Sequence, residues 1–218
     1  MKKVRNLLRS MFPDLYSLLY RVLKGPRRYK NLFKSITHLR AQKILEVGVW
    51  NGKRAVEMID RAKKYNSDIS YYGFDLFEEL TEEKHKEELS KWPPSKSEVE
   101  SLLQKTGADI SLFTGNTLQS LPAAISSLPK MDFIFIDGGH SNETVLSDWE
   151  NVRTLMHKDT IVIFDDYWRN RVDGGSKLTV DAIDTEYYNL EILPEIDSFN
   201  NPDFGRLDIS FAKVTLRN

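Results

Sequence analysis

The segment Met131–Trp168 constrains the fold more than any other part of the chain. It contains two short apolar runs, Phe133–Ile136 and Ile161–Phe164, which are rich in β-branched and aromatic residues and carry no charge. Such runs are typical of strands that are buried on both faces of a parallel sheet. Between them, Glu143–Met156 has apolar residues at helical spacing. The segment is therefore predicted to be a strand–helix–strand unit with a right-handed crossover, whose two strands lie side by side.

Carboxylates follow both of these strands. Asp137 comes after the first strand, and Asp165 and Asp166 come after the second. Because adjacent strands are about 4.8 Å apart, the three side chains should meet at the carboxyl edge of the sheet, where open α/β sheets bind ligands. They could simply cap the loop or helix that follows, but crowded carboxylates repel one another unless a cation or a proton relieves them. We therefore favour a site for a hard, oxygen-preferring ion, Mg²⁺ or else Mn²⁺ or Ca²⁺.

Length and composition exclude several classes of protein. The chain has 218 residues, enough for one α/β domain with additions. Its net charge of -1 gives no argument for nucleic-acid binding, and the absence of Cys excludes disulfides and thiolate catalysis. No apolar run approaches the roughly 18–20 residues that span a bilayer, and the N-terminus lacks the apolar stretch of a signal peptide. We expect a soluble cytoplasmic protein.

Residues 1–30 are basic and are predicted to form an amphipathic helical extension, while residues 31–218 form the main domain. The helical prediction comes from apolar residues at helical spacing within a basic segment. The helix could lie on an anionic membrane or on a partner subunit. We favour packing on its own domain, since a core-facing helix needs the same apolar residues. The apolar residues at helical spacing are Leu15, Leu18, Leu19 and Val22.

A glycine-containing turn follows the first predicted strand of the main domain, Lys43–Val47. Its pattern is Glu-x-Gly-x-x-x-Gly, from Glu46 through Gly48 to Gly52. This differs from the dinucleotide fingerprint, and there is no P-loop, so the turn suits a ligand with an amino-acid tail and no phosphate. Asp75 ends the next strand, where it can accept hydrogen bonds from the ribose of an adenosyl ligand. The alternative for Asp75 is a solvated carboxylate.

Residues 76–109 form an unusually long connection, and we expect them to act as a helical insertion or lid. The connection contains a charged run, EELTEEKHKEELSKW, which is interpreted as a solvated helix face. A second helix begins near Ser95, because Ser95 and Glu98 have the spacing of a capping box.

The rest of the chain is predicted to complete the sheet. The strand Ile110–Phe113 leads into Gly115-Asn116, which either lines an adenine pocket or forms an ordinary turn. Tyr188–Pro194 and Leu207–Leu216 alternate in polarity and suggest a closing antiparallel pair. The residues between them, SFNNPDFGRLD, have turn chemistry.

Four motifs in register resemble one enzyme family. They are EVGVWNG (46–52), YYGFDLF (71–77), FIDGGHSNETVLSDW (135–149) and IVIFDDY (161–167). The chain resembles the class I S-adenosylmethionine (SAM)-dependent methyltransferases, and within them the metal-dependent O-methyltransferases that include the catechol, caffeoyl-CoA and macrocin enzymes. This resemblance implies a Rossmann-like, doubly wound, mostly parallel α/β sheet of seven strands. The implied order is 3-2-1-4-5-7-6, with the last strand antiparallel and helices on both faces.

The resemblance also implies roles for individual residues. His140 falls at the position of the general base in the sugar-methylating branch, and its spacing from Asp137 and its loop position favour that role over a structural one. Asp137, Asp165 and Asp166 would bind the metal, and Asp137 would also take part in catalysis. The residues implied to hold SAM are Glu46, Gly48, Val49, Trp50, Asn51, Gly52, Asp75, Leu76, Gly115, Asn116 and Asp137.

These observations predict a SAM- and divalent-metal-dependent O-methyltransferase that acts on a hydroxyl of a sugar or polyol. A metal-bound hydroxyl has a lowered pKa and is held in place for transfer. The chain has Asp-Asp where the catechol branch has Asp-Asn, and it lacks that branch's Lys near Asp137. Both differences favour a sugar or polyol acceptor over a catechol. Two alternatives stay open: a catechol or phenol acceptor, and a non-catalytic adenosyl-binding or membrane-recruiting module. The expected partners are a small hydroxylated acceptor and further copies of the chain in a homo-oligomer, with no nucleic acid.

Overall fold

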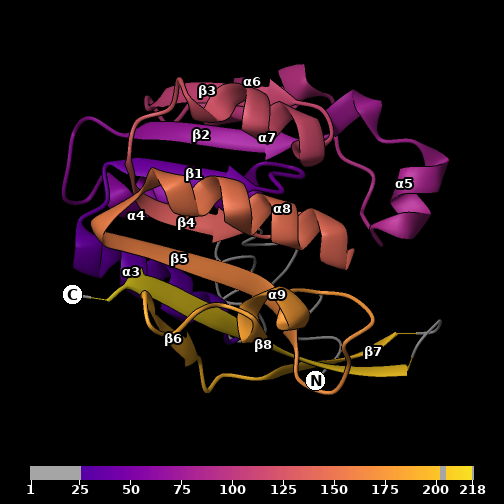
Figure 1. Ribbon diagram of the computed structural model, residues 1–218. Helices are drawn as coiled ribbons and strands as arrows, with labels where there is room; N and C mark the ends of the chain where they lie inside the picture. The colour runs from indigo at the N-terminus through magenta and orange to yellow at the C-terminus, as the bar shows by residue number, and fades with distance from the viewer. Residues whose placement is uncertain (1–25, 202–204, 218) are drawn as a thin grey trace, which may run out of the picture.

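The computed structural model describes residues 26–201 and 205–217, and it forms a single twisted sheet with helices packed on both faces (Figure 1). The helix predicted within residues 1–30 at Leu15–Val22 lies outside the described residues. No helix in the described part of the chain combines the length and the apolarity needed to cross a membrane.

The sheet has the order β3-β2-β1-β4-β5-β8-β6, and β7 pairs with β8 beside this path. Strands β1 to β5 are mutually parallel, β8 runs antiparallel to β5, and β6 and β7 run antiparallel to β8. The predicted order and the antiparallel closing strand are confirmed. The strands are β1 (Lys43–Val47), β2 (Ser70–Asp75), β3 (Asp109–Thr114), β4 (Met131–Ile136), β5 (Met156–Trp168), β6 (Tyr188–Ile192), β7 (Asp197–Asn201) and β8 (Gly205–Leu216).

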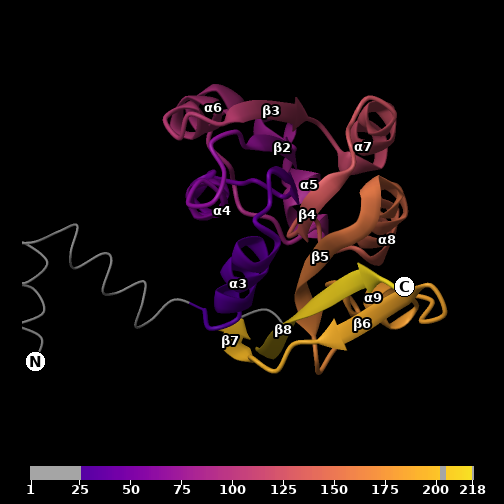
Figure 2. The same cartoon turned by 90° about the vertical axis from the view of Figure 1, so that its left-hand side faces the viewer.

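The helices cover the two faces of the sheet, as the doubly wound prediction required (Figure 2). Neighbouring residues of a strand point to opposite faces, so Ile44 joins the core cluster under one set of helices and Leu45 joins the other. One face carries α3 (Tyr29–Leu39), α4 (Lys53–Ala62) and α6 (Lys96–Gln104). The other carries α7 (Thr117–Ile125), α8 (Asn142–Val152) and α9 (Lys177–Asp181). The remaining helical elements are η1 (Phe77–Glu79), α5 (Glu82–Glu87) and η2 (Arg153–Leu155).

Side-chain caps fix where α6, α7 and α8 begin. Ser95 and Glu98 form the predicted capping box at the start of α6. Asn116 accepts a hydrogen bond from the backbone of Leu118 and caps α7, and Ser141 caps α8. Because α7 and α8 each follow a strand that ends at the carboxyl edge, these caps also set the shape of that edge.

The structure differs from the prediction in three places. The segment predicted as a turn between the last two strands contains β7, so the sheet has eight strands rather than seven. Strand β5 does not end before Asp165 but continues through Asp166 to Trp168. The helix predicted over Glu143–Met156 is α8, which ends at Val152, and Met156 already belongs to β5.

Candidate active site

A cavity of about 820 Å³ lies where the carboxyl ends of β1, β2, β4 and β5 meet. This volume is within the range of small-molecule sites, roughly 300–1,000 Å³. Gly52 does not line the cavity. It is the N-cap residue of α4, and a Cβ there would lie 3.0 Å from the side chain of Val99 in α6. The other residues predicted to bind SAM all line the cavity: Glu46, Gly48, Val49, Trp50, Asn51, Asp75, Leu76, Gly115, Asn116 and Asp137.

Gly48 allows two loops to touch at the floor of the cavity. Its φ is +93°, and a Cβ at this position would lie 2.0 Å from the backbone carbonyl oxygen of Asp137. The Gly48 amide donates to the carbonyl of Phe74 at 2.8 Å, and the Asp137 amide donates to that of Val47 at 2.8 Å. Only glycine fits at position 48, because any side chain would separate the ends of β1 and β4.

Asp75 organises the loop that follows β1. Its carboxylate accepts hydrogen bonds from the backbone amides of Trp50 at 2.7 Å and Phe77 at 3.0 Å. Trp50 has a φ of +48°, an uncommon value for a residue other than glycine, and the bond to Asp75 helps to hold it there. Burial raises the pKa of Asp75.

Glu46 is a buried carboxyl group with one unused oxygen. It lies within β1 rather than at its end, and the Tyr71 hydroxyl donates to its Oε2. Among the described residues, Oε1 has no hydrogen-bond partner. Burial raises the pKa of Glu46 to about 8, although the hydrogen bond from Tyr71 opposes that shift. A cationic ligand group in the cavity would satisfy this oxygen and favour the ionised form.

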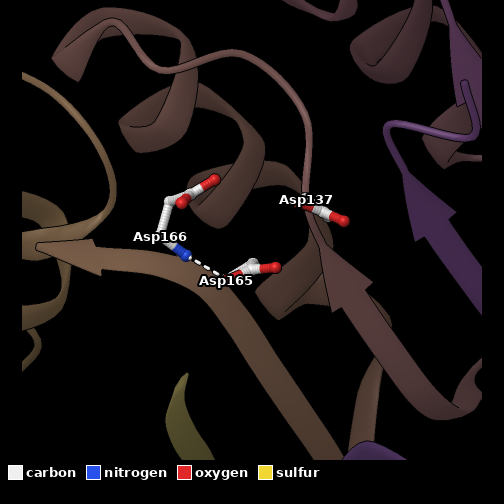
Figure 3. Close-up of side chains that lie close together, drawn as sticks. All are labelled: Asp137, Asp165 and Asp166. Carbon is white, nitrogen blue, oxygen red and sulfur yellow. Dashed lines mark hydrogen bonds between the residues drawn. The ribbon is translucent and has the colours of Figure 1, made fainter. Parts of the chain in front are cut away.

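Asp137, Asp165 and Asp166 meet at the ends of β4 and β5, and each can place one carboxylate oxygen within 4.8 Å of the others (Figure 3). Asp137 follows β4, whereas Asp165 and Asp166 lie in an irregularity of β5 where the pairing with β8 shifts register. Adjacent residues of a regular strand point to opposite faces. Asp166 has a φ of +52°, and this left-handed turn lets both neighbours line the same cavity.

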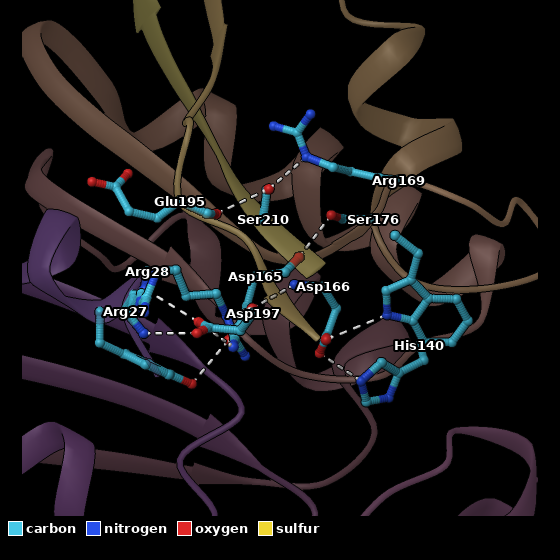
Figure 4. Close-up of polar contacts among 12 residues, drawn as sticks. Arg27, Arg28, His140, Asp165, Asp166, Arg169, Ser176, Glu195, Asp197 and Ser210 are labelled. Atoms are coloured by element: carbon cyan, nitrogen blue, oxygen red, sulfur yellow. Dashed lines mark hydrogen bonds and ion pairs between the residues drawn. The ribbon is translucent and has the colours of Figure 1, made fainter. Parts of the chain in front are cut away.

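The carboxylate of Asp165 is fully engaged by hydrogen bonds (Figure 4). Its Oδ1 accepts from Arg28 Nε at 2.7 Å and from the Asp166 amide at 2.6 Å. Its Oδ2 accepts from Arg28 Nη2 at 3.1 Å and from the Tyr29 hydroxyl at 2.9 Å. A carboxylate offers about four lone-pair sites, so Asp165 has none left in this structure.

His140 connects the cluster of Asp137, Asp165 and Asp166 to the segment around α5, which lines the cavity. Its Nε2 is 2.8 Å from Asp166 Oδ2, and its Nδ1 is 2.6 Å from the backbone carbonyl oxygen of Glu88. Both partners can only accept, so the ring donates from both nitrogens and is cationic. Burial alone would lower the pKa of His140, but the Asp166 carboxylate raises it to about 9. The ring also stacks on Trp168, with centroids 5.8 Å apart.

Asp137 and Asp166 keep free lone pairs that Asp165 lacks. No residue in the described ranges donates a hydrogen bond to the Asp137 carboxylate, and burial raises its pKa together with the charges of Asp165 and Asp166. Within residues 26–201 and 205–217, the Asp166 carboxylate accepts from His140 and, at 3.3 Å, from the indole of Trp168. Burial alone would raise the pKa of Asp166, but the His140 imidazolium lowers it.

Glu88 attaches the segment around α5 to the start of α8. Glu88 belongs to the charged run that was predicted to be a solvated helix face. Its side chain accepts from the Ser141 amide at 2.8 Å, the Ser141 hydroxyl at 2.9 Å and the Thr144 hydroxyl at 2.6 Å. Burial alone would raise the pKa of Glu88, but these hydrogen bonds lower it. A second attachment joins Trp50 Nε1 to the carbonyl oxygen of Trp92 at 3.1 Å. The solvated-face prediction is wrong for Glu88, which is buried.

Sequence reasoning missed several residues that line the cavity, among them Arg28, Glu88 and Phe199. Arg28 appeared only as one cation in a basic segment, and Glu88 as one carboxylate in a charged run. Phe199 of β7 lines the cavity from a segment predicted to be a turn. Nothing in the local sequence distinguishes these residues, because each reaches the cavity through contacts with distant parts of the chain.

Known proteins resemble the chain both in sequence profile and in fold. A family profile described as "Methyltransferase domain" matches residues 45–167. The O-methyltransferase from Bacillus cereus in complex with SAH has a TM-score of 0.59 at 17% identity, over 98% of this chain and 97% of that chain. The O-methyltransferase TomG from Streptomyces achromogenes, involved in tomaymycin synthesis and solved in complex with SAM, has a TM-score of 0.59 at 13% identity, over 87% of this chain and 79% of that chain. No curated protein sequence matches the chain.

Proposed function

Because the matched region covers more than half of its length, the chain belongs to the methyltransferase-domain family, and we propose that it transfers the methyl group of SAM to a hydroxyl of a sugar or polyol. The observation that carries this proposal is the single cavity lined by the residues expected to bind SAM, by three carboxylates and by His140. In one such cavity the methyl donor and the acceptor hydroxyl can be held in contact. The SAM and SAH seen in the two structural neighbours support the choice of donor.

The donor side of the cavity suits SAM. The unused oxygen of Glu46 is a buried acceptor that fits the cationic amino group of an amino-acid tail. Asp75 lies at the end of β2 and lines the cavity, where its carboxylate is placed to accept from ribose hydroxyls. SAM supplies an electrophilic methyl group. The acceptor oxygen forms the new O–C bond, the S–C bond breaks, and its electron pair stays on sulfur.

The acceptor side suits a molecule with several hydroxyl groups. Asp137 and Asp166 can accept hydrogen bonds from such hydroxyls, and Trp168 lines the same part of the cavity. We assign to His140 the removal of the hydroxyl proton. Because His140 is cationic in this structure, it must first release a proton and give up its bond to Asp166 or to Glu88.

The residues present also fit a divalent cation. Asp137, Asp165 and Asp166 form an all-oxygen set of the kind that Mg²⁺ prefers. When bound, such an ion lowers the pKa of a hydroxyl and orients it. Arg28 and His140 also place positive charge next to two of these carboxylates, Asp165 and Asp166. The cytoplasmic location, self-association and any membrane contact of residues 1–30 remain predictions.

The deciding experiment combines binding and turnover. Calorimetric titration with SAM should show micromolar binding that Asp75→Ala abolishes. Methyl transfer should then occur to methyl glycosides or alditols, be slower with catechols, and stop in excess EDTA.

Each part of the proposal can fail separately. A folded protein that binds no SAM, with or without Mg²⁺, would contradict the methyltransferase proposal. If methyl transfer to catechols is faster than to methyl glycosides or alditols, the proposed acceptor is a phenol and not a sugar. Full activity in EDTA would exclude a metal requirement, and proton transfer would then be assigned to His140 and Asp166 alone.

A further inference from the structure

We propose that Arg28 is a built-in counter-ion that withholds Asp165 from the divalent cation, so that the ion binds through Asp137 and Asp166. The inference builds on the proposed function, because it concerns the cation site described there. It differs from the expectation that all three carboxylates coordinate the ion equally.

The hydrogen bonds of Asp165 carry the inference. Arg28 contacts both oxygens of Asp165, and the Tyr29 hydroxyl and the Asp166 amide take the lone pairs that remain. A metal ion needs a lone pair of its ligand. Asp165 can therefore coordinate a cation only after one of these bonds has broken.

Arg28 is held too firmly to move aside at low cost. Its side chain is 7% exposed and that of Asp165 is 1% exposed. Its Nη1 donates to Asp197 of β7 at 3.1 Å, and its guanidinium lies 5.0 Å from the ring centroid of Tyr29 and 5.5 Å from that of Phe211. Breaking a buried ion pair leaves an uncompensated charge, which is strongly unfavourable.

The two other carboxylates remain available. The Asp137 carboxylate has no donor among the described residues, and Asp166 uses only part of its capacity on His140 and Trp168. The positive charge of Arg28 also repels an approaching cation. Because the affinity of a hard cation increases with the number of carboxylate charges that hold it, Arg28 should make the site weaker than a full three-carboxylate site.

Direct binding of Mn²⁺ tests the inference without measuring activity. Free Mn²⁺ is quantified by electron paramagnetic resonance during titration of the full chain at pH 7, with Arg28→Gln, Arg28→Lys and the control Arg27→Gln. Arg27→Gln removes the same charge from the neighbouring exposed residue, which reaches Asp197 only through its backbone amide. Arg28→Gln should lower the Mn²⁺ Kd by about tenfold or more, because it removes an adjacent charge and frees Asp165. The Mn²⁺ Kd of Arg28→Lys should lie between those of Arg28→Gln and the unmodified protein, and the Kd of Arg27→Gln should equal that of the unmodified protein.

An unchanged or higher Kd in Arg28→Gln would overturn the inference, and so would the absence of Mn²⁺ binding in every variant. If Arg28→Gln fails to fold, Arg28→Lys decides, since it keeps the charge but cannot hold both oxygens of Asp165. SAM titrations of the same samples separate the two proposals. SAM binding with no effect of Arg28 on Mn²⁺ would leave the methyltransferase proposal standing and remove only this one.

Discussion

At the scale of single residues, the donor side of the cavity depends on positions where no other side chain meets the local constraints. Gly48 is required by contact, because a Cβ would overlap the backbone of Asp137. Glu46 is set by burial, because one oxygen stays without a partner among the described residues. The first constraint determines whether the cavity has its shape, and the second determines which ligand charge it accepts.

Gly48→Ala should abolish SAM binding, since the added methyl group both forces the ends of β1 and β4 apart and disfavours the φ of +93°. Gly205→Ala is the matched control, because Gly205 also has a positive φ, +77°, but a Cβ there meets nothing within 4 Å. Calorimetric titration should show loss of SAM binding in the first variant and an unchanged Kd in the second. Equal affinity in both would mean that the approach of Gly48 to Asp137 is not needed.

SAM should bind more tightly as the pH rises from 5 to 7. The pKa of Glu46 is about 8 in the ligand-free protein, so the carboxyl group is protonated over this range and must lose its proton to pair with a cationic amino group, which stays charged below roughly pH 7.7. Affinity should therefore increase by nearly tenfold per pH unit, with proton release on binding. Titrations in buffers of different ionisation enthalpy count the protons. Glu46→Gln should flatten the profile, and a flat profile in the unmodified protein would contradict the pairing.

At the scale of elements, the segment around α5 joins the two halves of the cavity. Trp92 contacts the loop after β1 through Trp50, and Glu88 contacts the start of α8 and the ring of His140. The N-terminus of a helix favours a negative charge, so the Glu88 carboxylate suits its place at the start of α8. Through its backbone carbonyl, the same residue fixes one side of the proposed base.

Glu88→Gln should loosen this attachment, because an amide nitrogen would face the hydroxyl and amide donors of Ser141 and Thr144. We expect faster hydrogen exchange over residues 82–92 and 139–145, and a lower kcat with little change in the KM for SAM. The control is Glu87→Gln, on the exposed side of the same helix and paired with Lys84. Identical exchange in the two variants would show that Glu88 does not hold the segment.

The sequence predicts elements well where local pattern and final environment agree. The apolar runs of β1 and β4 are buried on both faces, and their residue types indicate this directly. Strand β7 was missed because its polar residues favour a turn, and only pairing with β8 makes them a strand. The extension of β5 past Asp165 was missed because it requires a left-handed Asp166, which is stabilised by contacts with the loop that follows. Cavity residues were predicted where a motif contains them and missed where, as for Arg28, they arrive from a distance.

At the scale of the whole molecule, the stability of the fold depends on a buried carboxyl group that the proposed reaction does not use. Asp148 of α8 is fully buried, and neither of its carboxylate oxygens has a hydrogen-bond partner of good geometry among the described residues. Burial raises the pKa of Asp148 to about 7, and the Thr117 hydroxyl offsets this only in part. The folded state therefore holds a proton that the unfolded chain releases at lower pH.

Raising the pH should lower the stability of the fold through Asp148. A raised carboxyl pKa contributes stability that is complete below the unfolded value and is lost as the pH rises through the folded value. Between pH 6 and pH 8 this loss should be about 1 kcal/mol. Denaturant unfolding at both pH values should show a smaller loss in Asp148→Asn than in the unmodified protein, while the exposed control Asp60→Asn should behave like the latter. An equal loss in all three would exclude Asp148 as its source.

The hydrogen bonds of Arg28 also order events during biosynthesis. Arg28 pairs with Asp197, 169 positions later in the chain, and the strand that Asp197 begins pairs with β8, the last strand of the sheet. A ribosome therefore releases every residue of the donor pocket before the acceptor side can close. Strand β8 also supplies core residues to both faces of the sheet, among them Phe211 and Val214. A chain terminated after β5 would therefore lack part of its core as well as the segment that completes the cavity.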